Sequence, residues 1–457
     1  TTEKRMTLCA PLFADATGDG SLGAWAGADF VVGREARSAY DEPHAPEKAD
    51  HCTMGNSLMF KARDAGHPVP FIKPDWANTY TEHDLRRRIH EDVTSGYWWI
   101  ELGGGRYNTI ADAEILRDEL LKAVYGVWDH IKNGGEHGAQ NMELEWVGML
   151  PGKRESRRLL GDYVLNEADC AGGRRFADAV AYGGWPMDVH TVEGFLNDSD
   201  DPTVWLRLED VYTIPYRCYY SRNIPNLFLC GRIISASHMA FASARVMATC
   251  AVGGQAVGTA AAIAVHRGIL PREVGAHIRE LQQTLLRDDC YIPGIRNEDA
   301  DDLLRDAQIS ASHALPECEA ENVLSGVSRT VGEQTNCWAA YAADHPTLTL
   351  RLAAPAAVRR IQLTFDSNLS REITISINRE VLGRQSAGTP PELVCSCRLV
   401  FVRDGADVRH IDIEGLWQRR YVLDLEQPIL CDAIRIENIR THGAKIIRIF
   451  EARAYRA

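Results

Sequence analysis

The sequence lacks the features that are typical of several classes of protein, and each absence excludes one class. No long run of Lys or Arg occurs and the formal net charge is −13, which argues against nucleic acid or an anionic membrane surface as a partner. No CxxC pair occurs among the twelve cysteines, so the sequence predicts no structural zinc site and no other metal site. Their irregular spacing also argues against a disulfide scaffold and slightly favours a reducing compartment such as the cytoplasm.

What remains is the composition of an ordinary soluble protein, 45% apolar and 25% charged over 457 residues. A chain of this length buries a large core and divides into at least two domains, and we expect a small molecule as its partner. The one long uncharged stretch, Val246 to Val265, is long enough to span a membrane. Its three glycines, two threonines and one glutamine make it only modestly hydrophobic, so it predicts a buried helix and no membrane partner.

The first 300 residues mix helices, loops and short strands, which predicts an α/β or α+β domain. Apolar residues recur at the spacing of one helix face, at positions 116, 120, 124, 127 and 131. A capping box at Thr109 is expected to begin this helix, and another at Thr81 to begin a more basic helix. We place the domain at residues 1–300, with a substrate region at about 30–210.

After about residue 316 the apolar pattern changes to a period of two. Apolar residues alternate with polar ones in four clear runs, at 373, 375 and 377, at 411 and 413, at 421, 423 and 425, and at 434 and 436. Runs of this kind, separated by turn residues, predict an antiparallel, all-β jelly-roll sandwich over residues 316–457. The acidic stretch 297–306 is expected to connect the two domains.

The short stretch PLFADATGDG, residues 11–20, has the pattern of a buried strand that ends in a tight turn. Ligands of parallel sheets gather at the carboxyl ends of strands, where glycine allows a close approach of the backbone. We therefore expect the turn at Thr17 and Gly18 to face a ligand. The glycine-rich strand–turn–helix that nucleotide-binding folds place upstream is not found ahead of it.

A second informative stretch is NLFLCGRIISASHMAFASARVMATCAVGGQAVGTAAAIA, residues 226–264. It predicts a buried strand at 227–230 that Gly231 ends. A polar loop with His238 follows, and then a small-residue helix that begins near Arg245. A helix amino terminus offers free N–H groups and the positive end of a dipole, which suits an anionic or electron-rich ring system.

Charge is concentrated in PGKRESRRL, residues 151–159. One interpretation is a solvated cluster of internally paired charges. The other is that Arg154 or Arg157 binds an anionic substrate or stabilises negative charge in a site. His238 also has two interpretations, a general base for a hydroxyl proton or a histidine hydrogen-bonded within a buried loop.

The stretches DATGDG, GKRESRRLLGDYVL and NLFLCGRIISASHMAFASARVMATCAVGGQAVGTAAA together resemble the FAD-dependent oxidoreductase family, which shares its flavin fold with the glutathione-reductase and succinate-dehydrogenase groups. The resemblance covers residue 1 to about 295 and implies FAD as the cofactor of a partial Rossmann-like domain with an inserted substrate region. The cofactor-binding residues that it implies are Thr17, Gly18, Asp19, Gly231, Arg232, Arg245, Met247 and Gly253. The catalytic residues that it favours are His238, Arg154 and Arg157.

The reaction implied by this resemblance is the dehydrogenation of an alcohol or a sugar-like substrate by hydride transfer to the flavin. The stretches AENVLSGVSR, NCWAA and IIRIFEARAY near the carboxyl end are similar to galactose-binding-like, discoidin-type domains, some of which bind sugars while others are structural. An alternative function is therefore a carbohydrate-binding or scaffold protein whose flavin region does not work.

One part of the family's pattern is not found, the amino-terminal GxGxxG turn that holds the FAD pyrophosphate. Gly253, Gly254 and Gly258 lie inside the expected late helix, and Gly103 to Gly105 precede no suitable helix. The resemblance therefore implies an amino-terminally incomplete flavin domain, with the adenylate half of FAD held by a segment or chain outside this sequence.

Overall fold

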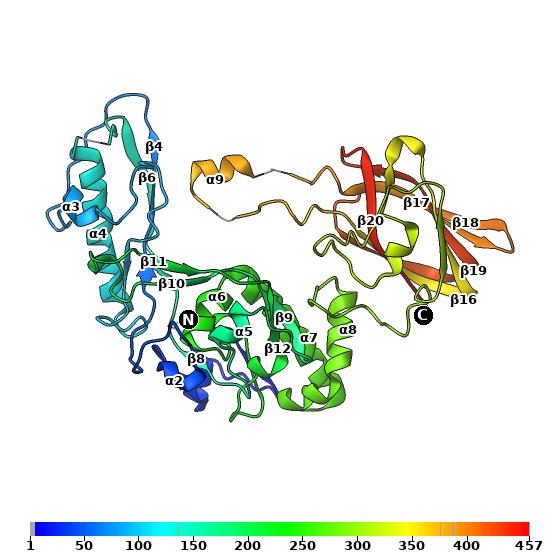
Figure 1. Ribbon diagram of the computed structural model, residues 1–457, viewed down its shortest axis with the longest axis horizontal. Helices are drawn as coiled ribbons and strands as arrows, with labels where there is room; N and C mark the ends of the chain where they lie inside the picture. The colour runs from blue at the N-terminus through cyan, green and yellow to red at the C-terminus, as the bar shows by residue number, and fades with distance from the viewer. Residues whose placement is uncertain (1–4, 136, 375, 386–387, 457) are drawn as a thin grey trace. The chain divides into compact units, whose positions relative to one another are not determined.

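The computed structural model describes residues 5–135, 137–374, 376–385 and 388–456, and its elements are labelled in Figure 1. The chain groups into two compact units, one of Thr1–Gln282 with Ile375–Leu382 and one of Gln283–Thr374 with Gly383–Ala457. The boundary expected near residue 300 lies inside the second of these units. Each unit is described by itself.

The first unit is a mixed α/β fold built from short strands in several small sheets. Its helices, and the helix that leads out of it, are α1 (Ser21–Ala26), α2 (Arg37–Tyr40), α3 (Glu82–Leu85), α4 (Ala113–Asn133), α5 (Glu167–Ala171), α6 (His238–Ala244), α7 (Met247–Arg267) and α8 (Ile278–Arg287). Its strands are β1 (Phe13–Asp15), β2 (Phe30–Val31), β3 (Asn56–Ser57), β4 (Phe60–Asp64), β5 (Glu101–Leu102), β6 (Met142–Val147), β7 (Gly152–Lys153), β8 (Arg158–Leu159), β9 (Ala179–Gly183), β10 (Met187–His190), β11 (Thr203–Leu206), β12 (Tyr212–Pro215) and β13 (Leu227–Leu229).

The two stretches that the sequence singled out lie side by side as a parallel strand pair. Strand β1 pairs with β13 in the register Phe13↔Leu227 to Asp15↔Leu229. The Asp15 side chain, which is fully buried, holds the turn that follows, because it accepts hydrogen bonds from the Thr17 backbone N–H, the Thr17 hydroxyl and the Gly23 N–H. The turn expected at residues 15–20 is therefore held by β1 itself.

Helix α4 confirms the predicted amphipathic pattern. The residues at 116, 120, 124, 127 and 131 are all buried on one face. They pack with Phe60 of β4 and with Trp128 of the same helix in one hydrophobic core of the first unit. The capping box expected at Thr109 is wrong: the residue before the helix is Asp112, whose side chain makes no capping hydrogen bond, and the Thr109 hydroxyl donates to the carbonyl of Glu155. The capping box at Thr81 is confirmed at the start of the short α3.

The helices after β13 differ from the prediction in two ways. His238 does not lie in a loop, because α6 begins at this residue, capped by Ser237 whose hydroxyl accepts from the Ala240 N–H at 3.1 Å. Helix α7 is also not fully buried. Within the described residues it is the one helix long and apolar enough to cross a membrane, but only 39% of its most apolar window is buried. Its exposed positions are Met247, Ala248, Ala251, Gln255, Gly258, Ala262 and Val265, followed by His266 and Arg267 in its last turn.

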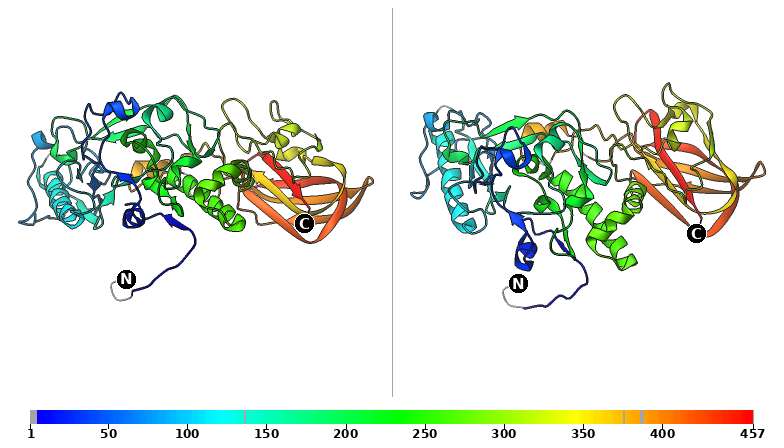
Figure 2. Two further views of the ribbon diagram at one scale, coloured as in Figure 1. Left: turned by 90° about the horizontal axis from the view of Figure 1, so that it is seen from below. Right: turned by 60° about the horizontal axis from the view of Figure 1, so that its bottom comes forward.

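The second unit contains an antiparallel sandwich whose strands are drawn from yellow to red in Figure 2. Its elements are β14 (Gln308–Ala311), β15 (Trp338–Tyr341), β16 (Leu348–Phe365), β17 (Val394–Arg403), β18 (Ala406–Ile413), β19 (Arg420–Thr441) and β20 (Ile446–Tyr455), and α9 (Arg379–Arg384) lies between β16 and β17 in the chain. The order is β15-β20-β16-β19-β17-β18, with β14 beside β16.

The sandwich confirms the predicted fold class but corrects three of the four predicted runs. The runs at 421–425 and 434–436 belong to the single long strand β19, whose register with β16 shifts twice. The run at 373–377 is not a strand: Ile373 is 84% exposed, and residue 375 lies outside the described residues. Alternation alone did not separate an exposed loop from a half-buried strand.

Asp302 gives the second unit a testable dependence on pH. Burial raises the pKa of its carboxyl to about 6, against the lowering effect of hydrogen bonds from the Ala454 and Leu304 N–H groups. The folded state therefore binds more protons than the unfolded state between about pH 4 and pH 6, and stability falls as the pH rises through this window. Asp302→Asn removes the ionisation. The free energy of unfolding of this variant, relative to that of the wild type, should therefore grow to about 3 kcal/mol above pH 6.

Chemical denaturation from pH 4 to pH 8 measures this difference, with the exposed Asp301→Asn as the matched control, which should show no such rise. A difference in free energy of unfolding between Asp302→Asn and the wild type that stays constant from pH 4 to pH 8 would contradict the raised pKa of Asp302.

Candidate functional site

The candidate site is organised by the connecting segment 153–158, which runs from the end of β7 to the start of β8. Five of its six residues are charged, KRESRR, and their side chains leave it in different directions. The segment thereby joins three polar clusters, which we name the Asp19 cluster, the Glu155 cluster and the Glu101 cluster.

The Asp19 cluster lies at the turn after β1. The Asp19 carboxylate accepts from Lys153 Nζ at 2.7 Å, from Arg232 at 2.9 Å and from the Ser156 hydroxyl at 2.8 Å. Burial raises the pKa of Asp19, but the hydrogen bonds from these three side chains outweigh burial and hold it below its usual value. Gly18, with φ +76°, lies so close that an added Cβ would be 3.3 Å from the Arg232 guanidinium. The predicted residues Gly18, Asp19 and Arg232 are thus brought together.

A cavity of about 250 Å³ opens beside this cluster. Arg157 and Ser156 line it from the connecting segment, and Phe30, His51 and Tyr107 are among the other lining residues. The Arg157 guanidinium donates to the Asp19 carbonyl at 3.1 Å and lies over the Phe30 ring at 5.4 Å from its centroid. A partly exposed guanidinium on a cavity wall can bind an anionic or hydroxyl-bearing ligand.

The Glu155 cluster surrounds a carboxylate that has no exposed surface. Glu155 accepts from the Met54 N–H and from Arg158, both at 2.9 Å, and His238 Nδ1 lies 3.1 Å from its Oε1. Burial raises the pKa of Glu155, but its interactions with His238 and Arg158 outweigh burial and lower it. Arg158 also donates to Glu35, which accepts the backbone N–H of His238.

The Glu101 cluster is a chain of five buried or nearly buried polar groups. Arg154 lies 3.3 Å from Glu101, whose other oxygen accepts the Gly55 N–H at 2.6 Å. His190 stands between two carboxylates, with Nδ1 2.6 Å from Glu101 and Nε2 3.0 Å from Asp188. Asp188 in turn accepts from Arg245 at 3.0 Å.

This chain engages both nitrogens of His190, an arrangement that an imidazolium satisfies by donating twice. Burial raises the pKa of Glu101, but Arg154 and His190 lower it further than burial raises it. Burial also lowers the pKa of Arg245, whose Nε has no hydrogen-bond partner among the described residues.

The remaining predicted residues lie apart from these clusters or point elsewhere. The Thr17 hydroxyl accepts the Ser21 N–H and so supports the turn. Gly253 packs against Tyr219, whose hydroxyl would lie 2.6 Å from an added Cβ, while Met247 is 69% exposed at the start of α7. Gly231 adopts φ +80° and an added Cβ would meet nothing within 4 Å, so it faces open space.

Sequence reasoning missed Glu101, His190 and Asp188, and it did not assign a role to Glu155. Glu101 follows the aromatic stretch 97–99 and is succeeded by three glycines, which was the available signal. Asp188 and His190 alternate along β10, a pattern of an ordinary exposed strand. Their pairing depends on contacts between stretches about ninety residues apart in the chain, which no local pattern reveals.

A glycine pattern was also overlooked, because Gly18, Gly20 and Gly23 match GxGxxG directly after β1 and at the start of α1. The geometry differs from a dinucleotide cradle. Helix α1 has six residues, and two of its first three N–H groups, those of Ser21 and Gly23, are occupied by Thr17 and Asp15. The strand paired with β1 comes from residues 227–229 and not from a neighbouring βαβ unit. The glycines instead allow α1 to pack on Leu159.

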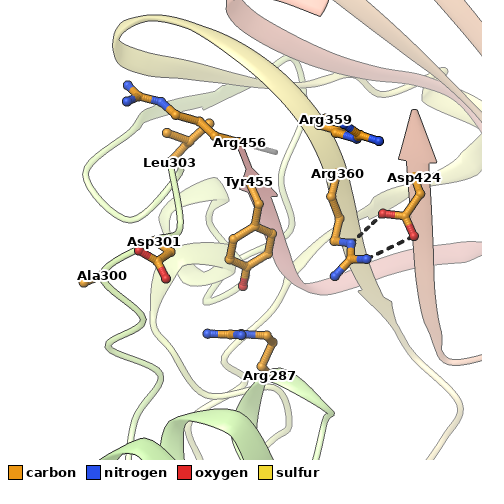
Figure 3. A pocket seen from close by; sticks show the side chains of 9 residues that line it. All are labelled: Arg287, Ala300, Asp301, Leu303, Arg359, Arg360, Asp424, Tyr455 and Arg456. Atoms are coloured by element: carbon orange, nitrogen blue, oxygen red, sulfur yellow. Dashed lines mark hydrogen bonds and ion pairs between the residues drawn. The ribbon is translucent and has the colours of Figure 1, made fainter. Parts of the chain in front are cut away.

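A second cavity belongs to the second unit and is lined by none of the predicted site residues. It has a volume of about 680 Å³, and Figure 3 shows its lining side chains. Arg360 forms a bidentate pair with Asp424 at 2.6 and 3.1 Å, and Arg287 lies over the Tyr455 ring. A lining this rich in arginine can bind anionic or polyhydroxylated molecules.

Comparison with solved structures finds similarity over about a third of this chain. The family 32 carbohydrate-binding module of C. perfringens NanJ, solved with galactose, is 15% identical with a TM-score of 0.25, over 34% of this chain and 98% of the module. The family 32 module of Streptococcus pneumoniae EndoD is 17% identical with a TM-score of 0.26, over 34% and 99%. A fucose binding module from Streptococcus pneumoniae is 9% identical with a TM-score of 0.26, over 34% and 95%.

No curated protein matches the chain. One protein family does, described as FAD dependent oxidoreductase, and its match extends over residues 1–285. That range is more than half of the 457 residues and contains the connecting segment and all three polar clusters. The chain therefore belongs to the FAD dependent oxidoreductase family.

Proposed function

We propose that this protein is an FAD-dependent dehydrogenase of an alcohol or a sugar-like substrate. The observation that carries the proposal is the connecting segment 153–158, which presents Arg157 to a cavity while its neighbour Glu155 holds His238. A cation for substrate binding and a carboxylate-held imidazole for proton transfer are the two groups that oxidation of a carbinol requires of the protein.

The residues present fit one end of the proposed cofactor. Gly231 leaves open space where a flat ring system can approach, and the Nε of the buried Arg245 has no partner among the described residues. We propose that Gly18, Gly231, Arg232 and Arg245 hold the flavin end. When bound, FAD supplies the acceptor for the two electrons that leave the substrate.

We assign the proton acceptor to His238 and not to His190. Glu155 accepts from Nδ1 of His238, which fixes the tautomer and leaves Nε2 with a free lone pair, and no described residue lies within hydrogen-bond distance of Nε2. Both ring nitrogens of His190 are engaged by carboxylates. His190 therefore supports Arg154 and Arg245 as a positioning residue.

Arg157 and Arg154 receive different roles in this proposal. Arg157 has no carboxylate partner among the residues that the structure describes and lines the cavity, so its charge is available to a ligand. Arg154 is held by Glu101, the Ser57 hydroxyl and the Trp98 carbonyl, which together fix its orientation. Arg154 therefore offsets the negative charge of Glu101 and positions its neighbours.

We also propose that a further polypeptide segment completes the cofactor site. The GxGxxG match at residues 18–23 forms no phosphate cradle, and the exposed positions of α7 are apolar except for Gln255 and, in its last turn, His266 and Arg267. An exposed apolar helix face of this length is usually covered in a soluble protein. A segment that carries a glycine-rich turn and packs on α7 would supply both the phosphate cradle and the cover for the exposed face of this helix.

Replacement of Arg157 tests the substrate-binding role. In the FAD-loaded protein, Arg157→Ala should slow substrate-driven flavin reduction by at least about tenfold, because the cavity loses its cation. The melting temperature should change little, because Arg157 makes no ion pair. Stopped-flow reduction measures the rate, and the exposed Arg207→Ala, which should behave as wild type, is the control. Normal reduction together with a large loss of stability would show that Arg157 has only a structural role.

Replacement of His238 tests the proton acceptor. The rate of flavin reduction in the wild type should fall toward acid pH, since a protonated imidazole accepts no proton. His238→Asn should remove this acid limb, whereas the exposed His67→Asn should retain it. Stopped-flow rates across pH for the three proteins decide the question, and an acid limb that persists in His238→Asn excludes the residue.

Cofactor retention tests the completing segment. The chain of 457 residues, incubated with FAD and passed over a desalting column, should keep well under one equivalent of flavin, because the glycine match at residues 18–23 offers no cradle for the pyrophosphate. Addition of the segment with the glycine-rich turn should restore one equivalent, measured by flavin absorbance. One equivalent retained by this chain alone would refute the proposed segment.

A further inference from the structure

A cluster of three histidines and one glutamate lies in the first unit, outside the site described above. Its members are Glu82 at the start of α3, His90 in the segment that follows, His130 in the last turn of α4 and His137 just beyond that helix. Figure 1 shows α3 and α4 together. We call this group the three-histidine cluster.

The distances within the three-histidine cluster match those of a tetrahedral metal site. Glu82 Oε2 lies 2.9 Å from His130 Nε2, 3.4 Å from His90 Nε2 and 3.8 Å from His137 Nε2. The two nitrogens of His130 and His137 are 3.1 Å apart, and all four ligand atoms lie within 4.8 Å of one another. Zinc–ligand bonds of about 2.0–2.1 Å in a tetrahedron place the ligands roughly 3.3 Å apart.

The orientation of His90 is fixed in the manner of a metal ligand. Its Nδ1 donates to the carbonyl of Arg88, so Nε2 carries the lone pair and points to the cluster. An outer hydrogen bond of this kind sets the tautomer and the ring orientation of metal-binding histidines. The three imidazole side chains are only 8 to 13% exposed, while Glu82 is 57% exposed. The carboxylate therefore closes the cluster on the solvent side, where an ion enters.

Hydrogen bonding alone satisfies this arrangement poorly. The Nε2 atoms of His130 and His137 are 3.1 Å apart, so they cannot both carry a hydrogen. If one of them carries a hydrogen and donates it to the other, that N–H is not available to Glu82. A cation that accepts a lone pair from each of the four groups removes the conflict.

We propose that the three-histidine cluster binds one Zn²⁺ ion. Three imidazoles and a carboxylate form a donor set that suits this ion, and four protein ligands make a closed, structural site. The ion would tie the end of α4 to the segment 86–99, which lacks regular structure and leads directly to Glu101. The absence of CxxC pairs, on which the expectation of no metal was based, does not bear on a site made of histidines.

Zinc content of the purified full chain tests the proposal, with the metal alone as the probe. After zinc loading and dialysis, the wild type should retain one equivalent by elemental analysis. His130→Gln should bind zinc at least about a hundredfold more weakly, since a direct ligand is lost. The matched control is His83→Gln on the same α3, whose ring faces Arg86 and not the cluster, and it should retain one equivalent.

A second measurement applies if His130→Gln does not fold. Wild-type protein freed of metal should give the visible ligand-field bands of tetrahedral Co²⁺ on cobalt addition, and Zn²⁺ should displace them and raise the melting temperature. Less than a tenth of an equivalent of retained zinc, a folded His130→Gln variant that retains it as wild type does, or the absence of the cobalt bands would each overturn the proposal.

Discussion

Glu155 places a fully buried carboxylate at the point where four distant stretches of chain meet. Met54, Arg158 and His238 each contact it, and Arg158 reaches on to Glu35. A buried charge of this kind is tolerated only when its partners are all in place, and removal of one partner typically costs about 3–5 kcal/mol. The carboxylate therefore requires β8, α6 and the stretch around Met54 to assemble together. This assembly fixes the position of the connecting segment on both sides of Glu155.

The connecting segment 153–158 has both a structural role and a proposed role in the site. Lys153 and Ser156 hold the turn after β1, Arg154 enters the Glu101 cluster, and Arg157 is left facing the cavity. A solvated charge cluster and an active-site cluster were alternatives for this stretch. Most of the charges are paired, as in a solvated charge cluster. The pairs are buried or partly buried, however, and Arg157 is left available to a ligand, as in an active-site cluster.

Features with a local cause were predictable from the sequence. The spacing of α4 and the alternation of Ile411 and Ile413 in β18 report burial directly, and the stretch around residue 228 forms the buried strand that its composition predicts. The prediction of a buried strand at residues 11–15 is wrong, because Asp15 is the one buried residue of β1. What failed depends on partners far along the chain. The exposed face of α7 and the long, bent β19 were not recognisable, because composition does not show which face is covered or where a strand continues through a bulge. Glu101 and His190 meet only after folding, and the glycines at 18, 20 and 23 match a phosphate-binding pattern whose donors are already occupied by Thr17 and Asp15.

The proposed activity is tested most directly by anaerobic mixing of the FAD-loaded, completed protein with a panel of alcohols and sugars, each also supplied with deuterium on the carbinol carbon. The account predicts that at least one member of the panel bleaches the flavin absorbance, and that deuterium slows the bleaching by a primary isotope effect, because the C–H bond breaks in that step. Flavin that dithionite reduces but that no alcohol or sugar bleaches, or bleaching that deuterium leaves unchanged, would contradict the account.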